Sequence, residues 1–223
     1  MRTGRAVCIG IDTSESPGGL VEADACALAD VARRQGFCSS TLLLGAAATR
    51  ARVCSQLRAA AAECRAGDLF LITFSGHGGR TPCAGGALPS GLHGVWVLSD
   101  GSWDDCEMHD ALAAFQPGVR VLVISDSCNG GVPGETQDAS PVQVAASVLV
   151  LSACRPERNA DAAGMPGHFT TALLRTWQRA PRGVSYREFY ELIAADMPAY
   201  QQPNYYWVGS RDARFEAEAP FTI

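Results

Sequence analysis

Two short polar strings hold the residues of this chain that could carry out chemistry. The first is Ser75-Gly76-His77-Gly78, and the second, Ser-Asp-Ser-Cys-Asn-Gly-Gly over 125–131, places Cys128 fifty-one residues after His77. A cysteine attacks a carbonyl carbon only as its thiolate, so it needs a nearby imidazole to take its proton. The two strings therefore indicate a cysteine hydrolase with Cys128 as nucleophile and His77 as its base.

Each string directly follows an apolar run that is typical of a buried strand. Leu69–Phe74 precedes the first string and Val121–Ile124 precedes the second. If both strands lie in one parallel sheet, their carboxyl ends meet at one edge, where open α/β folds place their active sites. We therefore expect His77 and Cys128 to lie side by side at that edge.

Small residues in the strings suit the same chemistry. Gly78 lets a backbone N–H approach the oxygen that gains negative charge, and the N–H of Cys128 supplies a second donor, so both are assigned to an oxyanion hole. Losing one such donor typically costs ~10²–10³ in rate. A single buried cysteine or turn histidine is more often structural, but the pair at this spacing is far more specific than either residue alone.

The rest of the chain alternates strand and helix signals, which is typical of an α/β domain with helices on both faces of a mostly parallel sheet. The segment from Gly78 to Gly94 is rich in Gly, Pro and Ala and predicts a flexible loop over the sheet edge. Strands are expected over 5–11, 41–44, 68–74, 119–125, 148–153 and 205–208, with a short one at 96–98. The first helix is expected to end at 36, and the second runs from an N-cap at 49 to 64. Further helices are expected over 104–115, 168–177 and 185–197.

Composition limits the class of protein. The 223 residues suit a single domain over 1–223, and the net charge of −5 with scattered arginines and no lysine argues against nucleic-acid binding. No apolar stretch approaches the ~18 residues of a membrane span, and no signal peptide is evident, so we expect a cytoplasmic protein without membrane contact. The nine cysteines include no C-x-x-C pair, which favours reduced thiols over disulfides or structural zinc.

The two strings resemble the catalytic motifs of the caspase-like cysteine peptidases, most closely those of the metacaspase and bacterial orthocaspase branch. The resemblance implies a caspase-like three-layer α/β/α sandwich around a mostly parallel sheet of about six strands. It also implies that His77 is general base and acid and that Cys128 forms an acyl-thioester, with no third catalytic residue required. Later segments of that domain are matched by 151–155, 167–174, 185–188 and 202–206, so the resemblance covers nearly the whole chain.

The same resemblance implies a substrate pocket for a basic side chain. Asp126 and Asp24 match the acidic pocket residues of metacaspases, although Ala23 replaces the asparagine that precedes the second of these, and Ser75 adds a hydroxyl. Two carboxylates in one pocket favour a substrate guanidinium, so arginine is preferred and lysine is accepted before the scissile bond. The simpler alternatives are an exposed acid at a helix start for Asp24 and a buried acid capping a turn for Asp126.

Calcium is the cofactor that the resemblance raises, although the reaction requires none. Asp104 and Asp105 fall where metacaspases carry an Asp pair, and Glu135 is a third candidate ligand. Ca²⁺ takes 6–8 oxygen ligands, and the further acid that the family pattern places in 78–99 is missing. We therefore favour the simpler alternative, in which the two aspartates cap a helix.

The segment after Cys128 bears on how the activity is switched on. Residues 129–154 contain no basic residue, so an arginine-specific enzyme cannot switch itself on by cutting there, and a small-molecule or protein activator is expected instead. Bacterial relatives suggest a stress, cell-death or defence role, and we favour a monomer. Two alternatives remain: a catalytically silent caspase-fold scaffold or ligand-sensing module, and a different thiol hydrolase or transpeptidase.

Overall fold

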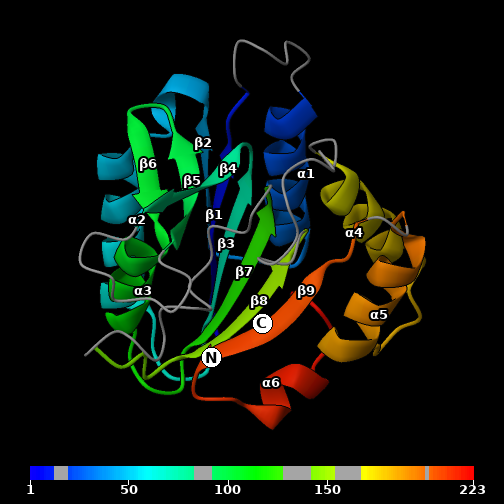
Figure 1. The fold of residues 1–223 in the computed structure, drawn as a ribbon. Helices are drawn as coiled ribbons and strands as arrows, with labels where there is room; N and C mark the ends of the chain where they lie inside the picture. The colour runs from blue at the N-terminus through cyan, green and yellow to red at the C-terminus, as the bar shows by residue number, and fades with distance from the viewer. Residues whose placement is uncertain (13–19, 83–91, 128–141, 154–166, 199–200) are drawn as a thin grey trace.

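The centre of the molecule is a six-stranded sheet, seen in Figure 1 of the computed structural model, which describes residues 1–12, 20–82, 92–127, 142–153, 167–198 and 201–223. All neighbouring strands pair in parallel except the last two, which are antiparallel. The predicted mostly parallel sheet is thereby confirmed. In spatial order the strands are β2 (Ser39–Leu44), β1 (Gly4–Gly10), β3 (Leu69–Ser75), β7 (Arg120–Asp126), β8 (Ser147–Ser152) and β9 (Asn204–Gly209).

Helices cover both faces of the sheet, as the three-layer prediction requires (Figure 1). One face carries α2 (Arg50–Glu63) and α3 (Asp105–Ala113), and the other carries α1 (Leu20–Arg34), α4 (His168–Arg179) and α5 (Tyr186–Asp196), with the short α6 (Ala213–Ala217) after β9. Of the described helices, none is both long and apolar enough to cross a bilayer.

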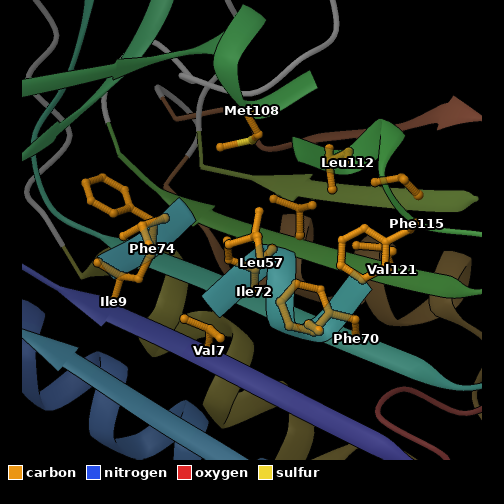
Figure 2. Packing of buried hydrophobic residues seen from close by; sticks show 14 of the residues in the cluster. Val7, Ile9, Leu57, Phe70, Ile72, Phe74, Met108, Leu112, Phe115 and Val121 are labelled. Atoms are coloured by element: carbon orange, nitrogen blue, oxygen red, sulfur yellow. The ribbon is translucent and has the colours of Figure 1, made fainter. Parts of the chain in front are cut away.

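Two hydrophobic cores hold the layers together, and the two-residue period of the strands sorts side chains between them. Phe70, Ile72 and Phe74 of β3 face the α2 and α3 side, whereas Leu69 and Leu71 face the α1 and α4 side. Every residue of β3 and β7 is buried, which explains why each strand contains a continuous apolar run in the sequence. Figure 2 shows the first core, where Leu57, Met108, Leu112 and Phe115 meet the sheet.

The predicted loop over 78–94 is wrong at both ends. A second, antiparallel sheet is formed by β4 (Gly78–Pro82), β5 (Leu92–Leu98) and β6 (Gly101–Asp104), while 83–91 lie outside the described residues. The glycine-rich composition hid β4, because its pairing with β5 comes from backbone hydrogen bonds rather than from an apolar pattern. Trp96 and Trp103 of this small sheet are fully buried in the core that it shares with α2 and α3.

Gly10, the last residue of β1, allows α1 to lie very close to the sheet. A Cβ atom at this position would lie 2.8 Å from the carbonyl oxygen of Val21 and 2.9 Å from the Cα of Glu22, both in the backbone of α1. Backbone atoms cannot rotate aside as a flexible side chain can. The position of α1, and of every residue on it, therefore depends on the absence of a side chain at Gly10.

Replacing this glycine with alanine is expected to destabilise the protein. We expect Gly10→Ala to lower the free energy of unfolding by about 1–3 kcal/mol, the usual cost of an overpacked core. Urea denaturation measures the loss. Gly79→Ala is the matched control, since its Cβ would lie 3.6 Å from Val95 and meet no closer atom. Equal stabilities of the two variants would contradict the close approach of α1.

Candidate active site

The two polar strings lie next to each other at the carboxyl edge of the sheet. Ser75 at the end of β3 pairs in register with Asp126 at the end of β7. The N–H of Gly76 then donates to the carbonyl oxygen of Asp126 at 3.2 Å, which continues the contact one residue beyond the strand. The predicted juxtaposition of the strings is therefore confirmed as far as Asp126. Cys128 lies outside the described residues, so its pairing with His77 stays a prediction.

His77 follows β3 and is held by its backbone. Its carbonyl oxygen accepts the N–H of Val97 in β5 at 2.9 Å, and the next residue, Gly78, pairs with Trp96. A Cβ on the preceding Gly76 would lie 2.9 Å from the ring of Phe74, so a glycine is needed there. The half-buried His77 is thus fixed between the main sheet and the small sheet. The oxyanion role of Gly78 stays a prediction.

The three predicted pocket residues are brought together on the α1 and α4 side of the sheet. The hydroxyl of Ser75 donates to Oδ2 of Asp24 at 3.1 Å. Ser75 and Asp126 are almost fully buried, and Asp24 is partly buried on α1. Asp24 is therefore not the exposed helix-start acid of the simpler alternative.

Asp126 is buried, as its simpler alternative expected, but it supports the start of a helix rather than a turn. Its Oδ2 accepts the N–H of Thr170, in the first turn of α4, at 2.8 Å. A carboxylate at a helix N-terminus is stabilised by the N–H groups and the helix dipole. Asp126 thus anchors α4 beside the cluster that it forms with Ser75 and Asp24.

The electrostatics of this cluster favour a bound cation. The pKa of Asp24 is raised to about 7, mainly by burial and also by the nearby Asp126, while the Ser75 hydrogen bond opposes the rise. Burial likewise raises the pKa of Asp126, opposed by its hydrogen bond with Thr170. Two carboxylates that are costly to ionise together become favourable partners once a positive group neutralises them.

The start of α4 is a part of this site that sequence reasoning treated only as a helix. Gly167 precedes α4 with a φ of +91°, and a Cβ there would lie 3.1 Å from Oδ2 of Asp24. A signal was present, because a glycine N-cap offers no side chain to the N–H groups of the first turn. Those groups need an outside acceptor, and Asp126 supplies one.

The predicted calcium ligands serve other partners. Asp104 forms a capping box with Glu107 at the start of α3, so the favoured cap interpretation is confirmed for Asp104. Asp105 accepts the N–H of Gly94 at 3.2 Å. The third member of this cluster, Cys106, offers sulfur, whereas Ca²⁺ requires oxygen. Asp104, Asp105 and Cys106 lie within 4.8 Å of one another, and Glu135 lies outside the described residues, so calcium binding stays a prediction.

Comparisons with known proteins place these observations in a family context. The family model of the caspase domain matches residues 3–214. Metacaspase-1B of Aspergillus fumigatus is 35% identical over 88 residues, covering 37% of this chain and 22% of that protein. Metacaspase-1B of Aspergillus clavatus is 44% identical over 69 residues, covering 29% of this chain and 17% of that protein. The chain thus matches less than a quarter of the length of these curated relatives.

A solved structure matches over almost the whole length. The crystal structure of protein GSU0716 from Geobacter sulfurreducens has a TM-score of 0.82 and is 33% identical, with 99% of each chain covered. The whole fold, including the sheet that carries the two strings, is therefore shared with a known protein.

Removing the cap at α3 tests the structural role of Asp104. We expect Asp104→Ala to lower the free energy of unfolding by about 1 kcal/mol, the usual cost of a lost N-cap. Urea denaturation with and without millimolar CaCl₂ measures this loss. Stabilisation of the parent protein by calcium, absent from Asp104→Ala, would overturn the cap interpretation.

Proposed function

Because the chain belongs to the caspase-domain family, we propose that it is a cysteine endopeptidase that cuts peptide bonds after basic residues, arginine above all. Family membership confirms the resemblance seen in the sequence and supports cysteine peptidase activity. The observation that carries the specificity is the convergence of Asp24, Ser75 and Asp126 next to His77. The partners are therefore peptide or protein substrates with a basic residue before the scissile bond.

In the proposed reaction His77 takes the thiol proton of Cys128. The thiolate adds to the scissile carbonyl carbon, and the N–H groups of Gly78 and Cys128 stabilise the resulting oxyanion. Collapse of this intermediate breaks the C–N bond, and His77 returns the proton to the leaving amine. His77 then removes a proton from water, which attacks the acyl-thioester, releases the carboxylic acid product and restores the thiol.

The pocket favours arginine over lysine on geometric grounds. The planar guanidinium has five N–H donors in a fixed fork, whereas the lysine ammonium is a compact point charge. Asp24 and Asp126 come from α1 and β7, so their carboxylates approach a bound side chain from two elements. A guanidinium can donate hydrogen bonds to both carboxylates at once. The hydroxyl of Ser75 lies between the strand ends and holds Asp24 in place.

A panel of fluorogenic peptides that differ only before the scissile bond tests the specificity. We expect kcat/KM to decrease from Arg to Lys, with no cleavage after Asp, because the two carboxylates repel an acidic side chain. Asp126→Asn should lower kcat/KM for the arginine peptide at least tenfold, as expected for loss of a charged hydrogen-bond partner.

Three controls separate the alternatives in this panel. Cys128→Ala and His77→Ala should abolish cleavage. Turnover in Cys128→Ala equal to that of the parent protein would favour a silent scaffold. Product analysis with an added amine would reveal a transpeptidase. Faster cleavage after Asp than after Arg would contradict the proposal.

The raised pKa of Asp24 predicts pH-dependent binding of arginine. Below pH 7 the carboxyl of Asp24 is mostly protonated, and above it the carboxylate is available to the guanidinium. We expect the Ki of an unreactive arginine-amide peptide to fall by about tenfold from pH 6 to pH 8, within the limit of one decade per pH unit.

The protonation of Asp24 also affects the stability of the fold, independently of catalysis. The proton is bound more tightly by the folded chain than by the unfolded one, so Asp24 weakens the fold as pH rises from about 4 to 7. Asp24→Asn should flatten the Ki profile between pH 6 and pH 8. A profile that stays equally steep in Asp24→Asn would contradict the role of this carboxyl.

The biological setting is part of the proposal. We assign the enzyme to the cytoplasm and to a bacterial stress, cell-death or defence response, switched on by a small molecule or a protein activator. The absence of basic residues from 129–154 supports activity without cleavage of that segment.

A further inference from the structure

One strand of the small sheet contacts both polar strings. In β5, the N–H of Val97 donates to the carbonyl oxygen of His77 at 2.9 Å. The neighbouring residue, Trp96, donates its indole N–H to Oγ of Ser125 at 3.1 Å. Two adjacent residues of one strand therefore hold the segment of the predicted base and the segment of the predicted nucleophile.

Trp96 itself is rigidly placed. Its ring stacks on Phe74 with centroids 4.5 Å apart and an interplanar angle of 8°, and its other neighbour is Trp103 at 5.6 Å. Its backbone pairs with Gly78, directly after His77. The side chain is fully buried in the same core as Phe74, whose place against the sheet is seen in Figure 2. Such a ring offers a fixed donor rather than a mobile one.

The hydrogen bond of Trp96 continues towards the nucleophile. Oγ of Ser125 lies 3.0 Å from Oγ of Ser127, and one hydroxyl donates to the other. Both serines are buried, and Ser127 directly precedes Cys128. An indole N–H is a donor only, so Ser125 must present an acceptor lone pair to it. The side-chain orientation of Ser125, and through it that of Ser127, is thereby set from β5.

We propose that Trp96 is a positioning residue of the reaction, which fixes the segment of Cys128 relative to that of His77 through Ser125 and Ser127. The inference rests on the His77 and Cys128 dyad of the proposed function, and it adds Trp96 as the residue that sets the geometry of this dyad. Displacement of a reacting group by about 1 Å can cost ~10² in rate, so a fixed donor at this point matters for turnover.

Trp103 provides a matched control for a substitution at Trp96. Both are buried indoles on paired positions of β5 and β6 in one core. Within the described part of the chain the indole N–H of Trp103 has no hydrogen-bond partner. Trp96→Phe and Trp103→Phe therefore remove similar volumes of buried ring, but only Trp96→Phe removes the donor to Ser125.

The first measurement does not depend on which peptide is cut. Alkylation of Cys128 by iodoacetamide is followed against pH, with the site identified by peptide mass spectrometry. In the parent protein Cys128 should react with an apparent pKa well below that of a free thiol, about 8.5, because His77 stabilises the thiolate. Trp96→Phe should raise this apparent pKa, whereas Trp103→Phe should leave it unchanged.

Steady-state kinetics on the best peptide of the panel give the second measurement. We expect Trp96→Phe to lower kcat at least tenfold with KM within about twofold, because the substrate pocket is not touched. Trp103→Phe should keep both constants within about threefold. Thermal unfolding of the two variants should shift by similar amounts, which separates positioning from stability.

A second variant removes the acceptor and guards against a folding defect at the tryptophan. Ser125→Ala should reproduce the kinetic effect of Trp96→Phe, and the double variant should be no worse than either alone, because both break one chain of hydrogen bonds. Additive effects, or equal losses of kcat in Trp96→Phe and Trp103→Phe, would overturn the inference. An ordinary thiol pKa at Cys128 in the parent protein would instead overturn the dyad, and the inference with it.

Discussion

The parallel register between β3 and β7 is the constraint on which the rest of the site depends. It places Ser75 opposite Asp126, and β1 pairs with β3 so that Gly10 lies opposite Ser75. The carboxyl ends of β1, β3 and β7 therefore lie in register, and α1 begins beside them. A slip of one residue would turn the buried apolar side chains of one strand to the wrong face, so core packing enforces the register. The stability of the core and the assembly of the site are therefore one requirement.

At the proposed pocket the fold holds two carboxyl groups in an unfavourable arrangement. Asp24 and Asp126 lie close enough for their charges to oppose each other, and burial raises the pKa of both. The Ser75 hydroxyl and the Thr170 N–H offset part of this cost, and the dipole of α4 favours the negative charge of Asp126. A positively charged side chain would relieve the remaining repulsion, which is how the proposed function turns a cost to the free protein into selectivity for a basic residue.

The sequence predicted those elements whose local pattern and final environment agree. β3 and β7 each contain a continuous apolar run because both faces of the strand are buried. The caps of α2 and α5 lie at Thr49 and Ser185, as their side chains indicate. β4 was missed because its ladder is made by backbone groups of a glycine-rich segment. The glycine N-cap at Gly167 signals that α4 needs an outside acceptor, but no local pattern tells which distant carboxylates lie beside it.

Alternation along β7 divides the site between the two faces of the sheet. Ser125 points to the side of the small sheet, where Trp96 bonds it, and Asp126 points to the side of α1 and α4, where Thr170 bonds it. In the proposed function the chemistry is therefore supported from one core and the specificity from the other. Because the two cores share only the strands, side chains on α1 and α4 can alter which residue is accepted while the support of the strings from β5 is unchanged. The two-residue period of β7 would thus separate the proposed catalysis from the proposed recognition within a single strand.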